Sequence, residues 1–440
     1  MLRIVFSFLL LSAPLALRAA TDAKPTTPPT QPTVGLDDIR TFTEVFNLVR
    51  QAYVDPVDNK TLMQNAIRGL LAGLDPHSEY LDQSQMQSLD EDTSGSYAGL
   101  GIEVFTVDGR LRVVAPIDDT PAAHAGIKPG DIIVRIDGEA ITPDNVNQAV
   151  DKLRGKAGTK ITLSVMHEGA SVPENYTLTR ALVRVASVRV RALEPGYIYV
   201  RIAQFQQDTG SELRHKLEAL LARKKPMRGA VLDLRSNPGG LLTSAVEISD
   251  DFLDSGTIVT TRGRIKQSDL SFSATPGDLL DGVPMVVLVD NGTASAAEIV
   301  AGALKDNHRA LLMGGRTFGK GSVQTVMPLD DTHAVKLTTA RYYTPNGTSI
   351  QAAGIQPDIE LANLKLSLRD VPPSLITGER DLPHHLKGAH ENDKHHDADS
   401  VDDGTLNDYA LSEAVIVLKG MALQHRPAGV AGKSVSGKKG

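Results

Sequence analysis

Three residues in the second half of the chain have side chains and spacing suited to the hydrolysis of an ester or amide bond. Ser295 begins a helix-like pattern that follows a short apolar run and a sharp Asn-Gly-Thr-Ala turn. The start of a helix carries backbone N–H groups without an intrahelical partner, and its dipole favours negative charge. Lys320 lies between two glycines, and Gln324 follows four positions later. We therefore interpret the chain as a serine hydrolase whose general base is a lysine.

The choice of lysine follows from what a serine nucleophile needs. A serine hydroxyl is a poor nucleophile until a base removes its proton. None of the 12 histidines has a convincing setting near Ser295, and the nearest in sequence, His308, is explained as a cation at a helix C-terminus. A lysine can serve when it is neutral, which burial favours. Helix and strand periods both place Gln324 on the face of Lys320, where a neutral amide orients the amine without raising its pKa.

The oxyanion that forms during acyl transfer needs two fixed hydrogen-bond donors. The backbone N–H of Ala296, just inside the expected helix, is one candidate. An upstream strand-like segment ends in an Asn-Pro-Gly-Gly turn, so Gly239 or Gly240 is the candidate for the second donor, and an ordinary strand-to-helix connection is the alternative. Glu298, three positions after the serine, is interpreted as a helix-capping carboxylate and not as a catalytic acid.

A pattern of short strands occupies the region before this core. Its most distinctive segment, Ala125–Gly138 (AGIKPGDIIVRIDG), closely resembles the central segment of PDZ domains. These domains bind peptide C-termini by adding the peptide as a strand at a sheet edge. Leu100, Gly101 and Ile102 match the loop that offers backbone N–H groups to the terminal carboxylate in that family, although a tight turn alone also accounts for the glycines. The resemblance implies carboxylate capture at these three residues.

Composition indicates an ordinary globular protein. The chain has 440 residues, 41% of them apolar and 22% charged, which allows roughly two to four domains. The net charge of −7 gives no reason to expect nucleic acid as a partner, because its binders carry a concentrated basic surface. The absence of cysteine excludes disulfides and a lipid-modified N-terminal cysteine.

The N-terminus predicts the compartment. Arg3 precedes the apolar run Ile4–Leu17, the layout of a secretory signal peptide. The run is too short for a comfortable membrane span, and Leu17 or Arg18 makes the cleavage position imperfect. We expect a cleaved signal and a periplasmic or otherwise exported protein, with an uncleaved anchor as the alternative.

Two amphipathic helices are expected after a Pro/Thr-rich tether. Their apolar faces need a partner, either the main core or a second subunit. They end at the turn Asp75–Leu81, which contains His77 and Ser78. We interpret these two residues as part of a turn rich in cap-forming residues and not as a catalytic pair.

The C-terminal region contains a polar segment and a helix. The segment Ile376–Asp403 is rich in histidine and acidic residues, but their spacing fits no standard metal-ligand set. We expect a disordered insert and no metal. An amphipathic helix over Leu406–Leu423 is expected to pack on the core or on another subunit.

Three sequence blocks together resemble the carboxyl-terminal processing peptidases, also called tail-specific proteases, of serine peptidase family S41. They are NGTASAAE at 291–298, FGKGSVQ at 318–324 and RSNPGG at 235–240. The resemblance covers roughly Leu36–Ile359. It implies that Ser295 is the nucleophile, that Lys320 is the general base positioned by Gln324, and that no metal or organic cofactor takes part. It also implies protein substrates recognised by their C-termini.

The expected fold class is α/β, because strands and helices alternate after the PDZ-like region. The resemblance implies a protease core of the ClpP/crotonase type with an inserted PDZ domain and helical terminal regions. The expected regions are a signal peptide (1–20), a linker (21–35), an N-terminal helical region (36–95), a PDZ domain (96–185), the peptidase core (186–365) and a C-terminal region (366–440). Expected partners are protein substrates, an adaptor or activating protein, and further copies of the chain that assemble through terminal helices.

Two other functions compete with this interpretation. One is a non-catalytic PDZ adaptor on a protease-like scaffold. It is disfavoured because every expected catalytic position holds a residue type that can perform its role. The other is an acyl-CoA hydratase-like enzyme, which the α/β layering alone supports and which leaves the PDZ segment unexplained.

Overall fold

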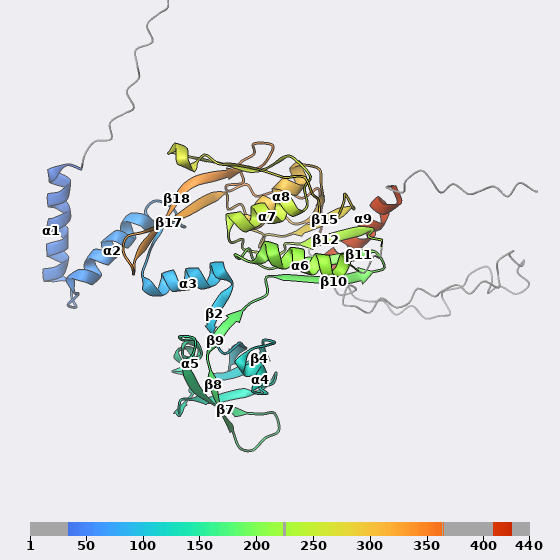
Figure 1. Ribbon diagram of the computed structural model, residues 1–440. Coiled ribbons are helices and arrows are strands. Elements are labelled where there is room, and N and C mark those ends of the chain that lie inside the picture. Colours follow the sequence, from blue (N-terminus) through green and yellow to red (C-terminus); the bar gives the residue numbers. More distant parts are fainter. Residues whose placement is uncertain (1–33, 223–225, 363, 365–407, 425–440) are drawn as a thin grey trace, which may run out of the picture. The chain divides into compact units, whose positions relative to one another are not determined.

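The computed structural model describes residues 34–222, 226–362, 364 and 408–424 (Figure 1). The expected signal peptide, nearly all of the tether and the histidine-rich insert lie outside these residues. The chain divides into two compact units, 1–69 and 70–440. The first contains α1 (Leu36–Ala52) and most of α2 (Asn59–Ala72). No residue of α1 is buried, and apolar side chains such as Phe42 and Leu48 are exposed.

A six-stranded sheet forms the centre of the second unit. Its order is β10 (Val188–Glu194), β11 (Tyr197–Ile202), β12 (Gly229–Asp233), β15 (Met285–Val289), β16 (Leu311–Gly314) and β19 (Ile359–Glu360). All neighbours are parallel except β10 and β11. Every residue of β12 and β15 is buried, as expected for parallel strands covered on both faces. The predicted α/β class is confirmed.

Helices cover both faces of this sheet (Figure 1). They are α6 (Thr209–Leu221), α7 (Leu242–Asp251) and α8 (Ala296–Asp306) on one face and α9 (Tyr409–Gln424) on the other. Successive strand side chains point to opposite faces, so Leu232 packs with the first group and Val231 with α9. Leu411 and Leu418 of α9 are buried there. Of the two alternatives for the C-terminal helix, packing on its own core is the one found.

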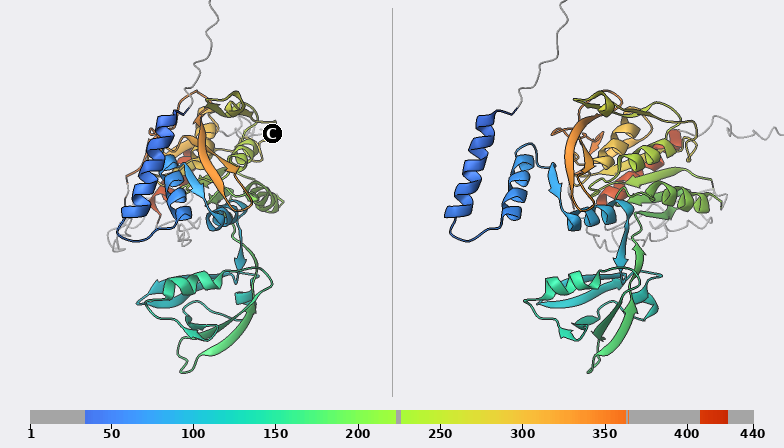
Figure 2. Two further views of the ribbon diagram at one scale, coloured as in Figure 1. Left: turned by 90° about the vertical axis from the view of Figure 1, so that its left-hand side faces the viewer. Right: turned by 60° about the vertical axis from the view of Figure 1, so that its left-hand side comes forward.

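A second sheet carries the segments around the candidate base. Its strands, in order, are β1 (Glu79–Leu81), β18 (Ala334–Tyr343), β13 (Thr257–Gly263) and β14 (Ser271–Ser273). The strand β17 (Ser322–Pro328) also pairs with β18. The short 3-10 helix η1 (Lys266–Ser268) lies between β13 and β14 in the sequence. The β17–β18 hairpin is long and curved (Figure 2, orange). Glu79 of β1 pairs with Lys336 of β18, so the sheet joins the turn after α2 to strands far along the sequence.

The PDZ-like region has its own sheet and core. The sheet contains β3 (Ile102–Val107), β4 (Arg110–Pro116), β5 (Ile132–Ile136), β7 (Lys160–Met166) and β8 (Glu174–Thr179), with β6 (Glu139–Ala140) paired to β5. The helices α4 (Pro121–His124) and α5 (Val146–Leu153) accompany it, and buried Leu111, Ile133 and Leu163 fill its centre. The ribbon of β2 (Ser96–Gly99) and β9 (Ala181–Arg184) follows α3 (Gln83–Ser94).

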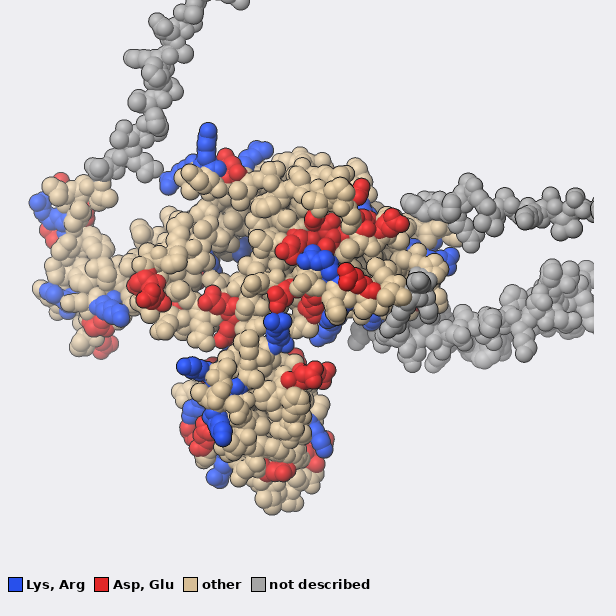
Figure 3. Space-filling model, viewed as in Figure 1, with Lys and Arg blue, Asp and Glu red and all other residues tan. Residues whose placement is uncertain are grey.

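The charged surface is mixed. On the face that Figure 3 shows, Lys and Arg side chains lie among Asp and Glu side chains, and no extended basic surface is seen among the described residues. In the part of the chain that the structure describes, no helix is long and apolar enough to cross a membrane.

Candidate active site

Ser295 has an unusual backbone conformation at the start of α8. Its φ of 55° and ψ of −117° lie in a region that L-residues rarely adopt, at a cost of about 1–3 kcal/mol that the surroundings must enforce. The preceding turn is held firmly: Thr293 Oγ1 donates to the Leu234 carbonyl at 2.8 Å, and Asp290 Oδ1 accepts the Gly292 N–H at 2.9 Å. A strained residue on a strand–turn–helix corner is typical of the serine nucleophile in α/β hydrolases.

A single buried carboxylate joins the serine segment to the lysine segment. Glu298 is fully buried, and its Oε2 accepts the N–H groups of Ser295 at 2.8 Å and Lys320 at 2.9 Å. Its Oε1 accepts the Thr317 hydroxyl at 2.5 Å and the Gly319 N–H at 2.8 Å. The capping interaction expected of Glu298 is therefore present, but three further hydrogen bonds extend it to the loop that carries Lys320.

The substitution Glu298→Gln tests this connection. An amide can present an oxygen to only one pair of donors, so its NH₂ group must face at least one backbone N–H group of the other pair. We expect kcat to fall on the order of 10- to 100-fold through misplacement of the base, and the free energy of unfolding to fall by about 1–3 kcal/mol. Steady-state kinetics and urea unfolding measure the two effects.

The matched control is Glu247→Gln on α7, whose carboxylate is half exposed. It should change neither quantity appreciably. A Glu298→Gln enzyme with the parental kcat would show that the carboxylate does not align the two segments.

Lys320 lies in a partly buried niche. Gly319 has a φ of 92°, and a side chain there would meet the Gly354 backbone nitrogen at 2.9 Å, so only glycine allows the loop to approach so closely. Burial lowers the pKa of the Lys320 ammonium below its usual range, Lys336 lowers it further, and Glu79 acts in the opposite direction. The niche thus favours the neutral amine that a general base requires.

The three candidate catalytic side chains do not form a hydrogen-bonded chain in this conformation. Within the described residues, no hydrogen bond joins the Ser295 side chain to that of Lys320 or the Gln324 amide to Lys320. Burial raises the pKa of Tyr342 to about 12, and hydrogen bonding to the Ser295 side chain opposes the rise, so Tyr342 is the neighbour of the serine hydroxyl. The Gln324 amide nitrogen donates to Ser322 Oγ at 2.9 Å and Thr338 Oγ1 at 3.3 Å.

The two glycines proposed for the oxyanion site differ in their contacts. Gly239 lies against the serine corner: a Cβ on it would be 3.0 Å from the Ala296 nitrogen. Its own N–H, however, donates to Asn237 Oδ1 at 2.9 Å. Among the described residues, the N–H groups of Gly240 and Ala296 have no hydrogen-bond acceptor, so these two are available to a developing oxyanion.

The turn before β1 lies closer to the candidate base than the sequence suggested. Asp75 accepts N–H groups of His77 at 2.8 Å and Ser78 at 3.0 Å, which confirms the expected turn. Burial lowers the pKa of His77, and the positive charge of Lys320 lowers it further. The charge of Lys320 thus acts on His77, and the pairing of β1 with β18 brings the turn to the sheet that also contains β17.

The residues expected to bind a peptide carboxylate line a groove of the PDZ-like region. Leu100, Gly101 and Ile102 share a cavity of about 320 Å³ with Val150 and Leu153 of α5. Within the described chain, the N–H groups of Leu100 and Gly101 have no acceptor. Apolar walls and free N–H groups are the two features that terminal-carboxylate recognition needs.

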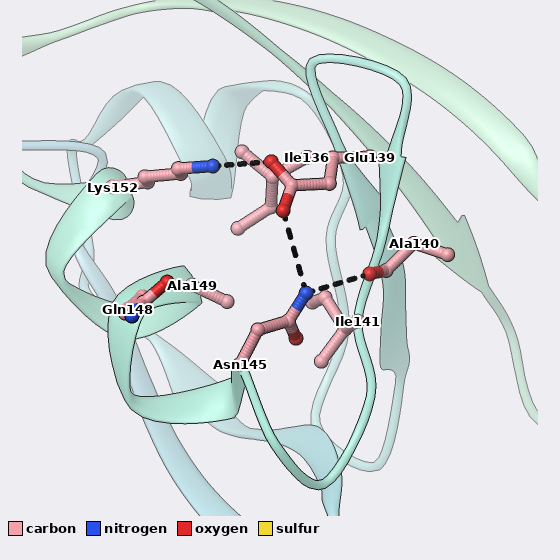
Figure 4. Close-up of a pocket in the computed structure, with 8 residues that line it drawn as sticks. All are labelled: Ile136, Glu139, Ala140, Ile141, Asn145, Gln148, Ala149 and Lys152. Carbon is pink, nitrogen blue, oxygen red and sulfur yellow. Dashed lines mark hydrogen bonds and ion pairs between the residues drawn. The ribbon is translucent and has the colours of Figure 1, made fainter.

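A hollow on another side of α5 has a different character. Glu139, Asn145 and Lys152 line it, and Glu139 binds both the Lys152 amine and the Asn145 amide (Figure 4). Its volume of about 10 Å³ holds about one water molecule. Its polar groups satisfy one another, so this hollow is not a candidate ligand site.

No metal-binding arrangement is found in the described ranges, where no group of three or more His, Cys, Asp or Glu side chains is placed to hold an ion.

Comparisons with known proteins identify the family of the chain. The model of peptidase family S41 matches residues 196–361, a PDZ domain model matches 112–165, and the model of the activating protease CtpB N-terminal domain matches 16–85. The photosystem II D1 C-terminal processing protease, a solved structure, is 34% identical with a TM-score of 0.44, and the match covers 74% of this chain and 94% of that one.

Curated relatives extend over most of the chain. A carboxy-terminal-processing protease of Bartonella bacilliformis is 44% identical over 382 residues, 86% of this chain and 88% of the relative. Carboxy-terminal processing protease CtpA of Bacillus subtilis is 36% identical over 318 residues, 72% of this chain and 67% of the relative. With this extent of identity, the chain belongs to the carboxy-terminal processing proteases of family S41 and is a serine protease with a PDZ domain.

Proposed function

We propose that this protease is exported, recognises protein substrates by their C-termini, and hydrolyses peptide bonds with Ser295 as nucleophile, Lys320 as general base and Gln324 as the residue that positions Lys320. The observation that carries the proposal is the buried Glu298 carboxylate, which binds the backbone of both Ser295 and Lys320. One rigid group thereby sets the separation of nucleophile and base, and preorganisation of this kind is a large part of enzymatic rate enhancement.

In the proposed reaction, Lys320 Nζ takes the proton of the Ser295 hydroxyl as the oxygen attacks the substrate carbonyl carbon. The oxyanion accepts hydrogen bonds from the N–H groups of Ala296 and Gly240. The Lys320 ammonium then gives its proton to the leaving amine as the C–N bond breaks. Water hydrolyses the acyl-enzyme in the second half, with Lys320 again as base.

Catalysis requires the Ser295 hydroxyl to exchange its contact with Tyr342 for one with Lys320. Unliganded enzymes often have long or misaligned catalytic hydrogen bonds that shorten only with substrate bound.

Export and assembly rest on separate observations. Residues 1–20 have the order of a signal peptide, which supports a periplasmic or otherwise exported location. The exposed apolar side chains of α1 support assembly of copies through the N-terminal helices, since contiguous apolar surface marks contact sites. An adaptor or activating protein completes the proposed set of partners.

Dependence on the substrate C-terminus tests the proposed recognition. A fluorescein-labelled peptide with apolar C-terminal residues is added to the Ser295→Ala protein, and fluorescence anisotropy gives its Kd. Amidation of the peptide C-terminus should raise the Kd about 10-fold or more, because each hydrogen bond to a charged group contributes about 1.5–3 kcal/mol. Cleavage of a protein that ends in the same residues, followed by mass spectrometry, should show the same preference.

A pair of substitutions on α5 localises the binding. Val150 lines the groove of Leu100 and Gly101, whereas Gln148 lines the small polar hollow (Figure 4). Val150→Glu should abolish peptide binding and Gln148→Glu should leave it unchanged. Equal affinity for free and amidated peptides would contradict recognition of the terminal carboxylate.

A further inference from the structure

The turn before β1 is hydrogen-bonded to the residue that contacts Gln324. Thr338 of β18 donates its hydroxyl to Asp75 Oδ1 at 3.1 Å and its backbone N–H to Ser78 Oγ at 3.1 Å. Ser78 Oγ in turn donates to Asp75 Oδ2 at 2.7 Å. Gln324 Nε2 lies 3.3 Å from Thr338 Oγ1. A continuous chain of hydrogen bonds thus runs from Asp75 through Thr338 to Gln324.

The ionisation of Asp75, at the end of this series of hydrogen bonds, determines which group donates in each of them. Burial raises the pKa of the Asp75 carboxyl, but hydrogen bonds from Ser78, His77 and Thr338 outweigh burial and hold that pKa below its usual range. An ionised carboxylate only accepts hydrogen bonds. The single hydroxyl proton of Thr338 is therefore committed to Asp75, and Thr338 Oγ1 can only accept from Gln324.

This commitment fixes the orientation of the Gln324 amide. Its NH₂ group supplies both hydrogen bonds, to Thr338 Oγ1 and to Ser322 Oγ at 2.9 Å. In the described residues, Gln324 Oε1 has no donor. The carbonyl oxygen of the amide is thus the end left free for a donor outside this chain.

Lys320 lies two residues before β17, the strand that pairs with β18. Lys336 and Thr338 are two residues apart on β18 and so share a face, and the charge of Lys336 acts on Lys320. A neutral lysine amine has two hydrogens and one lone pair. If Oε1 accepts one hydrogen, the lone pair is left for the proton of Ser295.

We propose that Asp75 and Thr338 are positioning residues, which hold the Gln324 amide with Oε1 toward the amine of Lys320 and NH₂ away from it. This inference rests on the proposed role of Lys320 as general base. The reverse amide orientation would place two donors against the amine and compete with Ser295 for its lone pair. The turn far upstream in the sequence thereby determines which way the base faces.

The charges around Lys320 come from three elements. They are Lys336 on β18, Glu79 on β1 and His77 in the turn. Lys336 and Glu79 form an ion pair. Substitutions at Thr338 change none of these charges, so a change in the kinetic pKa of such a variant reports on the amide.

The test compares Thr338→Val, Thr338→Ser and Thr339→Val in the full-length protease. Valine keeps the shape of threonine and removes only the hydroxyl. Thr339 is the neighbouring residue on the opposite face of β18, where its hydroxyl pairs with that of Thr325. The measurements are kcat, KM and kcat/KM across pH on a peptide substrate, with thermal unfolding of each variant.

We expect Thr338→Val to lower kcat on the order of 10- to 100-fold with little change in KM. Its kinetic pKa should fall, because loss of a fixed acceptor destabilises the ammonium form of Lys320. Thr338→Ser should restore both values, and Thr339→Val should match the parent.

Two outcomes overturn the inference: a Thr338→Val enzyme with the parental rate and pH profile, or a slower enzyme whose kinetic pKa is unchanged and which serine does not rescue. Failure of the proposed function itself would be distinguishable, because Ser295→Ala or Lys320→Met would then retain turnover.

Discussion

The substitution Ser295→Ala is expected to abolish peptide-bond cleavage. Removal of the nucleophile eliminates the acyl-enzyme route, and kcat should fall by a factor on the order of 10⁶. Alanine keeps the Cβ of residue 295, and the hydrogen bonds of the Thr293 hydroxyl and the residue 295 N–H that hold the corner do not involve the serine hydroxyl, so the corner should keep its unusual backbone angles. Cleavage of a protein substrate and labelling by a fluorophosphonate probe, mapped by mass spectrometry, measure the effect.

Stability and labelling provide the controls for this prediction. Ser295→Ala should unfold at nearly the parental urea concentration, since the change removes one hydroxyl contact worth about 1 kcal/mol. Ser211→Ala, on an exposed part of α6, should keep the full rate and the full label. Turnover by purified Ser295→Ala above a small fraction of the parental rate, or a label attached to another serine, would refute the assignment.

Much of the core could be predicted from local pattern. The apolar run Met285–Val289 is β15 with the same limits, and the helix after Ser295 is α8. These segments are strongly patterned because both lie in the interior, where apolar periodicity records burial. The same holds for β7 of the PDZ-like sheet (Lys160–Met166), where Ile161, Leu163 and Val165 alternate along the strand and are buried.

The connections between these segments could not be predicted in the same way. The capping interpretation of Glu298 followed from its spacing to Ser295, whereas its bonds to Thr317, Gly319 and Lys320 depend on the path of the loop that follows β16. Periodicity in the sequence indicates which apolar residues share a buried face, but it does not indicate which distant group a single polar side chain binds. Burial of Glu298 at 0% exposure is the signal, and it is visible only in three dimensions.

The Asp75 turn illustrates the largest gap between sequence and site. Asp75 and Thr338 are separated by 263 residues, and the β17–β18 hairpin that presents Thr338 and Gln324 was not identified from the sequence. Its strands mix exposed polar and apolar residues, so alternation is weak there. The interpretation of Asp75–Leu81 as a turn was correct for Asp75–Ser78, but Glu79–Leu81 forms strand β1. The pairing of β1 with β18 and the hydrogen bonds of the turn to Thr338 bring the turn to this sheet.

The second large effect is expected for Lys320→Met. Methionine has nearly the length of lysine but no amine, so the Ser295 proton has no acceptor and kcat should fall on the order of 10³-fold or more. In the parent enzyme, activity should rise with pH as Lys320 deprotonates. Because the pKa of Lys320 is lowered, this rise should begin below the range expected for a free lysine. Rates measured across pH on one peptide substrate give the profile.

The substitution Lys320→Met should lower activity but raise stability at neutral pH. Where the folded-state pKa of a lysine lies below its unfolded value of about 10.4, the unfolded chain binds more protons between the two values, and stability rises with pH there. Below the folded-state pKa the full destabilisation by the buried ammonium is present. Lys320→Met removes it, so this variant should unfold at higher urea than the parent at neutral pH, with the difference shrinking as pH approaches 10.4.

Substitution of a charged neighbour of Lys320 tests whether Lys320 is the group whose titration sets the pH profile of activity. Lys336 lowers the pKa of Lys320 and Glu79 raises it, and the two form an ion pair. Lys336→Met removes the repulsion and frees the carboxylate, so both effects raise the pKa of Lys320, and the activity profile should move to higher pH. Thr338→Val should move it to lower pH. The group that titrates in catalysis is not Lys320 if neither Lys336→Met nor Thr338→Val shifts the pH profile of activity, or if Lys320→Met keeps the parental profile.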